Sequence, residues 1–213
     1  MLAIMLRTAY LDAAAIAADL LADPAVAARW DEPSALPELA VGGLAAHLGR
    51  QLTQVRDLVA APPAEMAPIT LPVHYSRAAW LGREIDAPAN VAIREQADEA
   101  AAGGPDAVRE TAVATLAALR EALPAEPADR VLLLWTGWAL TLDDFLTTRL
   151  MEIAVHCDDL AVSVGVPTPE FPPEVITPVF GLLTALSVER HGQVAVLRAL
   201  SRRERAPETI SAL

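Results

Sequence analysis

The segment from Leu142 to Val164 constrains the fold most, because it is a predicted helix that is apolar on most of its faces. One stripe at helical spacing is wholly apolar: Leu146, Leu150, Ile153, Cys157, Leu160 and Val164. The neighbouring stripe is largely polar: Phe145, Arg149, Glu152, His156, Asp159 and Ser163. Such a helix is typical of a bundle interior, where a polar stripe lines a crevice. The alternative is a solvated face with a surface ion pair between Arg149 and Glu152.

Composition favours an all-α protein. Apolar residues make up 54% of the 213 positions but aromatic residues only 4%, so the chain relies on alanine and leucine, which prefer helices to strands. This length suits one well-cored domain, and we expect a single domain over residues 1–213. The cluster of Arg202, Arg203 and Arg205 is interpreted as a solvated tail over residues 202–213.

Helical spacing and breaker residues divide the chain into segments. Long helices are predicted over residues 2–21, 38–60, 105–123, 142–164 and 173–203, with one or two more between Ser76 and Ala102. Residues 30–37 and 62–75 are predicted to be loops because they are rich in proline. The run Val131 to Trp135 fits a short strand or a buried extended linker, and the linker is preferred because no partner run is evident. The pattern predicts a bundle of four or more long helices.

Charge and cysteine content limit the classes of binding partner and the cellular compartment that the chain fits. A net charge of −12 argues against nucleic acid, which requires a basic face. All sixteen cationic side chains are arginine, which is typical of a GC-rich bacterial genome. One cysteine excludes an intramolecular disulfide and fits a reducing cytoplasm. Asp12 and Asp19 interrupt the apolar stretch that a signal peptide would need, and no run is long enough for a bilayer span. We therefore expect a cytoplasmic protein without membrane or nucleic-acid partners.

The polar stripe contains a candidate metal site. Glu152 and His156 are one helical turn apart, and an imidazole with a carboxylate is a ligand pair that zinc accepts. His47 is the candidate third ligand, since it occupies an apolar seam of its own helix where a buried imidazole needs a partner. An ordinary hydrogen-bonded core histidine is the alternative. His74 and His191 are expected at the surface, because one lies in a proline-rich loop and the other at a helix break.

These residues carry a resemblance to a known family. His47 within Leu44-Ala45-Ala46-His47-Leu48, followed by Arg149-x-x-Glu152-x-x-x-His156-x-x-Asp159-Leu160, resembles the mycothiol-dependent maleylpyruvate isomerase family of the DinB-like superfamily. The resemblance covers most of the chain and includes the approach from Asp144 to Arg149. It implies a DinB-like four-helix bundle, here with additional short helices. It also implies a divalent metal, usually zinc, held by His47, Glu152 and His156, with Asp159 as an auxiliary catalytic residue near the metal.

The activity implied by the resemblance is thiol chemistry. Mycothiol, a low-molecular-weight thiol, would add to a small electrophilic substrate, giving a transferase or an isomerase. Asp159 would orient a ligand histidine or handle a proton, and Arg149 would pair with Glu152 or hold a substrate carboxylate, the salt bridge being preferred.

The chain also departs from the family pattern. Residues 35–41 lack the cysteine and tryptophan of the family's Pro-Cys-Pro-Gly-Trp segment, and we expect the chain to end with the bundle and its arginine-rich tail. Thiol transfer to another electrophile is therefore expected rather than maleylpyruvate isomerisation. The alternative from a different class is a non-catalytic bundle, in which the triad binds metal for stability or forms a buried polar network.

Overall fold

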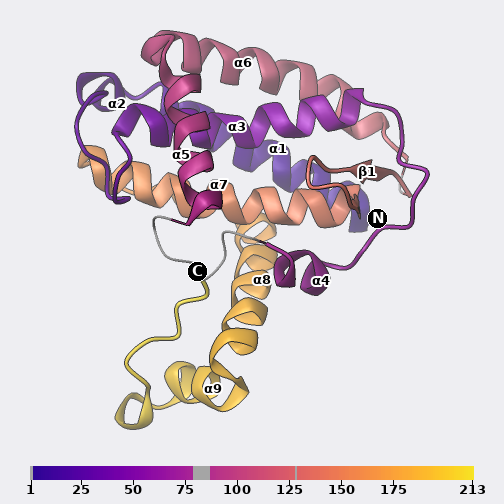
Figure 1. Cartoon of the computed structure of the whole chain (residues 1–213), viewed down its shortest axis with the longest axis vertical. Helices are drawn as coiled ribbons and strands as arrows, with labels where there is room; N and C mark the ends of the chain where they lie inside the picture. Colours follow the sequence, from indigo (N-terminus) through magenta and orange to yellow (C-terminus); the bar gives the residue numbers. More distant parts are fainter. Residues whose placement is uncertain (1, 79–86, 128) are drawn as a thin grey trace.

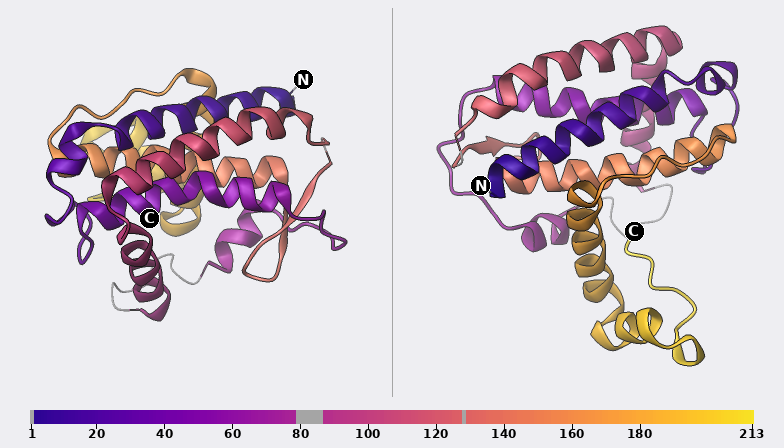
Figure 2. Two further views of the ribbon diagram at one scale, coloured as in Figure 1. Left: turned by 90° about the horizontal axis from the view of Figure 1, so that it is seen from above. Right: turned by 180° about the vertical axis from the view of Figure 1, so that it is seen from behind.

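Four long helices form the body of the protein. The computed structural model describes residues 2–78, 87–127 and 129–213. Helices α1 (Leu2–Leu21), α3 (Val41–Ala60), α6 (Gly104–Ala122) and α7 (Leu142–Val164) lie side by side as a bundle (Figures 1 and 2). In this bundle α7 packs against α1 and α3, and α6 covers the other side of both. The predicted all-α, DinB-like bundle with additional short helices is confirmed.

The core forms where the apolar stripes of these helices meet. The α7 stripe from Leu146 to Val164 is buried as predicted, against Leu44, Leu48 and Leu52 of α3. Helix α1 contributes mainly alanines, whose small side chains let the neighbouring backbones approach closely. The bounds of α7 match the prediction because both ends carry strong signals. The Thr141 hydroxyl accepts a hydrogen bond from the Asp144 amide at 3.1 Å, and Gly165 ends the helix in the left-handed conformation at φ 73°.

The loops hold more structure than expected. The short α2 (Pro24–Ala28) is capped by Asp23, whose carboxylate accepts from the Ala25 amide at 2.8 Å. Helix α3 begins at Val41 rather than Glu38, because a bridge between Pro33 and Ala40 holds residues 33–40 in a compact loop. Prediction of a plain connection over residues 62–75 was wrong, since α4 (Leu71–Ser76) lies there. Its proline stands in the first turn, where a missing amide donor costs nothing.

The middle of the chain contains one long helix and a hairpin. Helix α5 (Pro88–Ala101) packs on α3 and is followed by α6 and a 3₁₀ turn (Leu123–Ala125), while part of the predicted helical region 76–102 lies outside the described residues. The preference for a linker over Val131 to Trp135 was wrong. Strand β1 (Val131–Leu133) pairs antiparallel with β2 (Ala139–Thr141), in the register Leu132 opposite Leu140. The partner strand was missed because its three residues run straight into α7.

The C-terminal part projects from the bundle (Figures 1 and 2). The predicted helical region 173–203 consists of α8 (Pro173–His191), α9 (Gln193–Ser201) and a 3₁₀ turn (Arg203–Arg205), with the break at Gly192, whose φ is 80°. The arginines of the tail are exposed, and the chain then turns back along α8, where the Ser187 hydroxyl donates to the Ile210 carbonyl at 2.7 Å. We call residues 173–213 the appendage. In residues 2–78, 87–127 and 129–213, no helix combines the length and apolarity that crossing a membrane requires.

Candidate metal site

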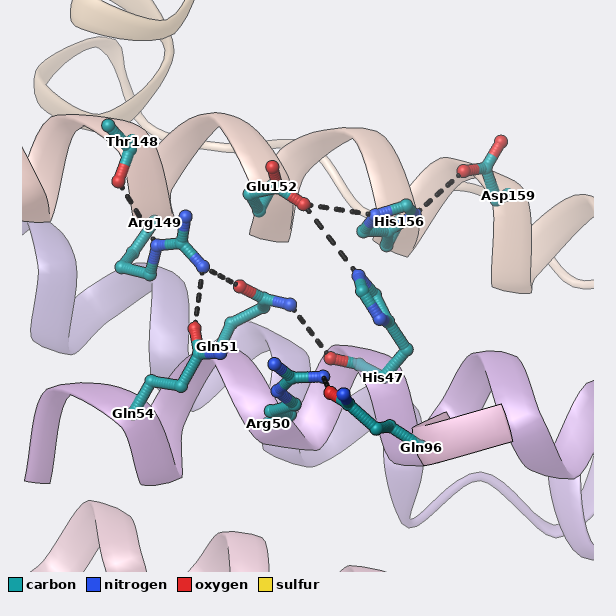
Figure 3. Close-up of polar contacts among 10 residues, drawn as sticks. All are labelled: His47, Arg50, Gln51, Gln54, Gln96, Thr148, Arg149, Glu152, His156 and Asp159. Atoms are coloured by element: carbon teal, nitrogen blue, oxygen red, sulfur yellow. Dashed lines mark hydrogen bonds and ion pairs between the residues drawn. The ribbon is translucent and has the colours of Figure 1, made fainter. Parts of the chain in front are cut away.

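The structure brings the three predicted ligands together between two helices. His47 comes from α3, and Glu152 and His156 come from neighbouring turns of α7 (Figure 3). The Glu152 Oε2 atom lies 3.2 Å from His156 Nε2 and 3.8 Å from His47 Nε2. The two imidazole rings meet edge to face, with centroids 4.7 Å apart. A set of one ligand atom from each residue lies within 4.8 Å of one another.

Asp159 holds the ring of His156, one of the candidate ligands. Its Oδ2 atom accepts a hydrogen bond from His156 Nδ1 at 3.0 Å, one turn beyond the histidine on α7 (Figure 3). This bond turns His156 Nε2 toward Glu152 and His47. Metal-binding histidines commonly donate their second ring N–H to a carboxylate, which fixes the tautomer and raises the basicity of the ligand nitrogen. The contact assigns Asp159 a positioning role, and its predicted part in proton transfer stays a prediction.

Burial and close contacts set the charge states of the metal-free site. Burial alone would lower the pKa of His156, but hydrogen bonds to Asp159 and Glu152 raise it to about 9. Burial would also raise the pKa of Glu152, yet bonds from the two histidines hold it well below its usual value. The pKa of His47 is lowered by burial and by the nearby His156. His156 is therefore an imidazolium between two carboxylates at pH 7, and His47 beside it is neutral.

The donor set fits a divalent cation. Two imidazoles and one carboxylate form a combination found in catalytic zinc sites, where three protein ligands leave a coordination position open. His47 Nε2, His156 Nε2 and the Glu152 carboxylate face one another, and the second nitrogen of His156 is already occupied by Asp159. These three residues would hold the cation, whose binding would displace the proton that His156 shares with Glu152.

A small pocket opens beside the two histidines. It measures about 150 Å³, and its wall combines the 33–40 loop with α5. Leu36, Pro37 and Leu39 give this wall an apolar side, within the segment that departs from the family pattern. The loop is fixed to α7, because the Ala35 amide donates to the Ser163 hydroxyl at 2.8 Å. The departure in sequence thus lies directly at the pocket.

Arg149 does not form the preferred ion pair with Glu152. The ion pairs that the structure describes for Glu152 are with the two histidines. Arg149 instead reaches across to α3, where its Nη1 donates to Gln51 Oε1 at 2.5 Å and to Gln54 Oε1 at 2.7 Å (Figure 3). The spacing prediction was wrong because it considered neighbours on one helix and had no information on the partner helix.

The two other histidines differ from each other. His74 is half-buried rather than at the surface, and its Nδ1 accepts a hydrogen bond from Trp138 Nε1 at 3.0 Å. Burial, reinforced by the positive charge of Arg149, lowers the pKa of His74 to about 4, so it is neutral at pH 7. His191 lies on the appendage, where its Nε2 contacts the Ser211 carbonyl oxygen at 2.8 Å. Neither histidine belongs to the cluster of possible metal ligands in the described residues.

Sequence reasoning missed several residues of the site. Gln51 lies one helical turn after His47 on the same apolar seam, and a polar side chain at such a position was itself a signal. Asn90, Ile93 and Arg94 of α5 line the pocket, and nothing in their local pattern pointed to it.

Comparison with known proteins identifies the family of the chain. No curated protein and no solved structure matches it. Residues 10–161 match the family described as the mycothiol maleylpyruvate isomerase N-terminal domain, and this range contains His47, Glu152, His156 and Asp159 but not the appendage. Since the match covers well over half of its residues, the chain belongs to the mycothiol maleylpyruvate isomerase N-terminal domain family, a DinB-like family.

Proposed function

We propose that this protein is a divalent-metal-dependent enzyme that uses mycothiol to act on a small electrophilic substrate, as a thiol transferase or an isomerase. The observation that carries the proposal is the convergence of His47, Glu152 and His156 in a member of a family named for mycothiol chemistry. Zinc is the metal we expect, because the ligand set is two imidazoles and a carboxylate.

The nucleophilic thiol has to come from a co-substrate. Cys157 is the one cysteine of the chain; it lies in the core, and burial raises the pKa of its thiol to about 12. A thiol in such surroundings is inert, because the thiolate is the reactive form. A bound divalent cation supplies the missing activation by lowering the pKa of a thiol that coordinates it.

The chain's own residues hold this site and shape its access. Glu152 and the two histidines supply the donor atoms, and Asp159 keeps His156 in the ligating tautomer. The pocket beside them is small and apolar on the side of Leu36, Pro37 and Leu39. These residues favour a substrate with a compact apolar portion, since burying apolar surface is the main contribution such a wall can make.

Metal analysis of the purified protein tests the proposal first. We expect one equivalent of metal in the native chain and none in the His47→Ala and Glu152→Ala variants. His191→Ala, which removes the histidine at the C-terminal end of α8, is the matched control and should keep the metal. Metal-loaded protein should then convert a small electrophile only when mycothiol is present, consuming the thiol if it is a transferase and regenerating it if it is an isomerase. A native chain that stays metal-free after incubation with zinc would overturn the proposal.

A second candidate is a non-catalytic bundle in which the same residues serve the fold. The observation in its favour is that Glu152 Oε2 lies 3.2 Å from His156 Nε2 and 3.8 Å from His47 Nε2, so these largely buried groups can satisfy one another. Unfolding of His156→Ala would support this candidate. A folded His156→Ala variant that has lost thiol-dependent turnover would support the enzyme.

A further inference from the structure

Arg149 is a buried cation with uncharged hydrogen-bond partners. Its side chain is 8% exposed, and its Nε and Nη1 atoms donate to Thr148, Gln51 and Gln54. In the described part of the chain no ion pair joins it to a carboxylate. The guanidinium carbon also lies 5.0 Å from the centroid of the Phe145 ring, and the charge of Arg149 helps to lower the pKa of Glu152. Burying a charge without a hydrogen-bonded carboxylate partner is nevertheless costly for stability, and an apolar residue would pack here at lower cost. Arg149 therefore calls for an explanation other than packing.

Gln51 is the residue through which Arg149 is connected to α3 and α1. It is 1% exposed, and its side-chain amide is held at both ends: Oε1 accepts from Arg149 Nη1, and Nε2 donates to the His47 carbonyl at 2.9 Å. Its backbone carbonyl accepts a hydrogen bond from the Tyr10 hydroxyl at 3.0 Å. Gln51 thus joins α1, α3 and α7 at one point, with its polar atoms paired as burial requires.

This connection lies next to the candidate metal site. Gln51 follows His47 by one turn on α3, and Arg149 precedes Glu152 by about one turn on α7 (Figure 3). His47 itself contacts the α7 ligands loosely, at 3.8 Å from Glu152 and edge to face with the His156 ring. Apolar packing alone tolerates small shifts between two helices, whereas the charged hydrogen bonds from Arg149 Nη1 to Gln51 and Gln54 restrict the distance and register.

We propose that Arg149 and Gln51 are positioning residues of the metal site. The link between them sets the separation and register of α3 and α7, so that His47 meets Glu152 and His156 in ligand geometry. The proposal rests on the metal-binding part of the proposed function and adds residues outside the ligand set.

Cobalt binding to matched glutamine variants tests the link. Gln51 and Gln54 both accept from Arg149, but Gln51 also bonds the His47 carbonyl. We expect Gln51→Leu to weaken Co²⁺ binding by about 10- to 100-fold, as loss of groups supporting metal ligands usually does, and Gln54→Leu to change it little. The visible absorption of bound Co²⁺ reports the coordination geometry, which should change in Gln51→Leu and stay native in Gln54→Leu. A merely structural role would leave this spectrum unchanged.

Arg149 variants provide an independent set, which keeps the proposal testable if Gln51→Leu unfolds. Arg149→Met should show the same loss of Co²⁺ affinity, and Arg149→Lys should recover part of it through one remaining charged donor. Thermal unfolding of each metal-free variant identifies those that are folded. Native affinity and spectrum in Arg149→Met, or equal losses in both glutamine variants, would overturn this proposal alone. No Co²⁺ binding by the native chain would overturn the proposed function and this proposal with it.

Discussion

The bundle and the appendage depart from the usual distribution of side chains in opposite ways. Between α3 and α7 the bundle buries Arg149 and leaves the Glu152 side chain only 13% exposed, whereas on α9 the appendage leaves Leu197 and Leu200 66% and 71% exposed. These two departures differ in what they indicate about function. Scattered exposed leucines are common on protein surfaces, but buried charges are expensive and persist only where partners or a function keep them. The difference teaches that function should be sought in the bundle, and that substitutions there should have the larger effects.

Removing a ligand should give the largest effect. We expect His156→Ala to weaken zinc binding by more than about 100-fold, beyond what loss of a supporting residue causes. The variant should keep native helix content, because the apolar stripe of α7 is unchanged. Zinc affinity by chelator competition, with circular dichroism on the same samples, makes the measurement. Native zinc affinity in His156→Ala would mean that His156 is not a metal ligand, and the bundle would lose its functional contrast with the appendage.

The pH dependence of binding should be the next largest effect. His156 has a pKa of about 9 in the metal-free site, so a metal must displace its proton at lower pH. Zinc affinity should therefore rise by up to about tenfold per pH unit between pH 7 and 9 and then level off. Metal-free stability should move the other way, because the contribution of this raised pKa is present below pH 6.5 and is lost as the pH rises through 9. Chelator competition and urea unfolding across this range follow both trends. If zinc affinity and metal-free stability both rose, or both fell, with pH, the charge states assigned to the site would be wrong.

Loss of the orienting carboxylate should have a smaller effect. Asp159→Asn keeps the size of the side chain but weakens its bond to His156 Nδ1, so we expect zinc affinity to fall by about 10- to 100-fold. The pH at which affinity levels off should also move down, since Asp159 raises the pKa of His156. Asp158→Asn, on the neighbouring exposed position, is the control and should leave both quantities unchanged. Equal behaviour of the two variants would exclude an orienting role.

The sequence predicted local features well and contacts between helices poorly. Helix α7 was correct at both ends because Thr141 and Gly165 are strong local signals. His47 was paired with α7 partly through a family resemblance, since spacing alone left it an ordinary core histidine. The hairpin was missed because strands of three residues show no periodicity. The link from Arg149 to Gln51 was missed because it depends on the register between two helices 98 positions apart, which no pattern within one helix contains.

Substitution on the appendage should give the smallest effect. Leu200→Ser places a hydroxyl where the side chain is already 71% exposed, so the free energy of unfolding should change by no more than about 0.5 kcal/mol. Leu150→Ala in the bundle provides the scale, because emptying a fully buried position typically costs about 2–5 kcal/mol. Urea unfolding of both variants measures the contrast, and zinc affinity of Leu200→Ser should remain native. A loss of several kcal/mol in Leu200→Ser would mean that this leucine is covered in solution, and the exposed face of α9 would then have to be counted as a packed region, as the buried residues of α8 already are.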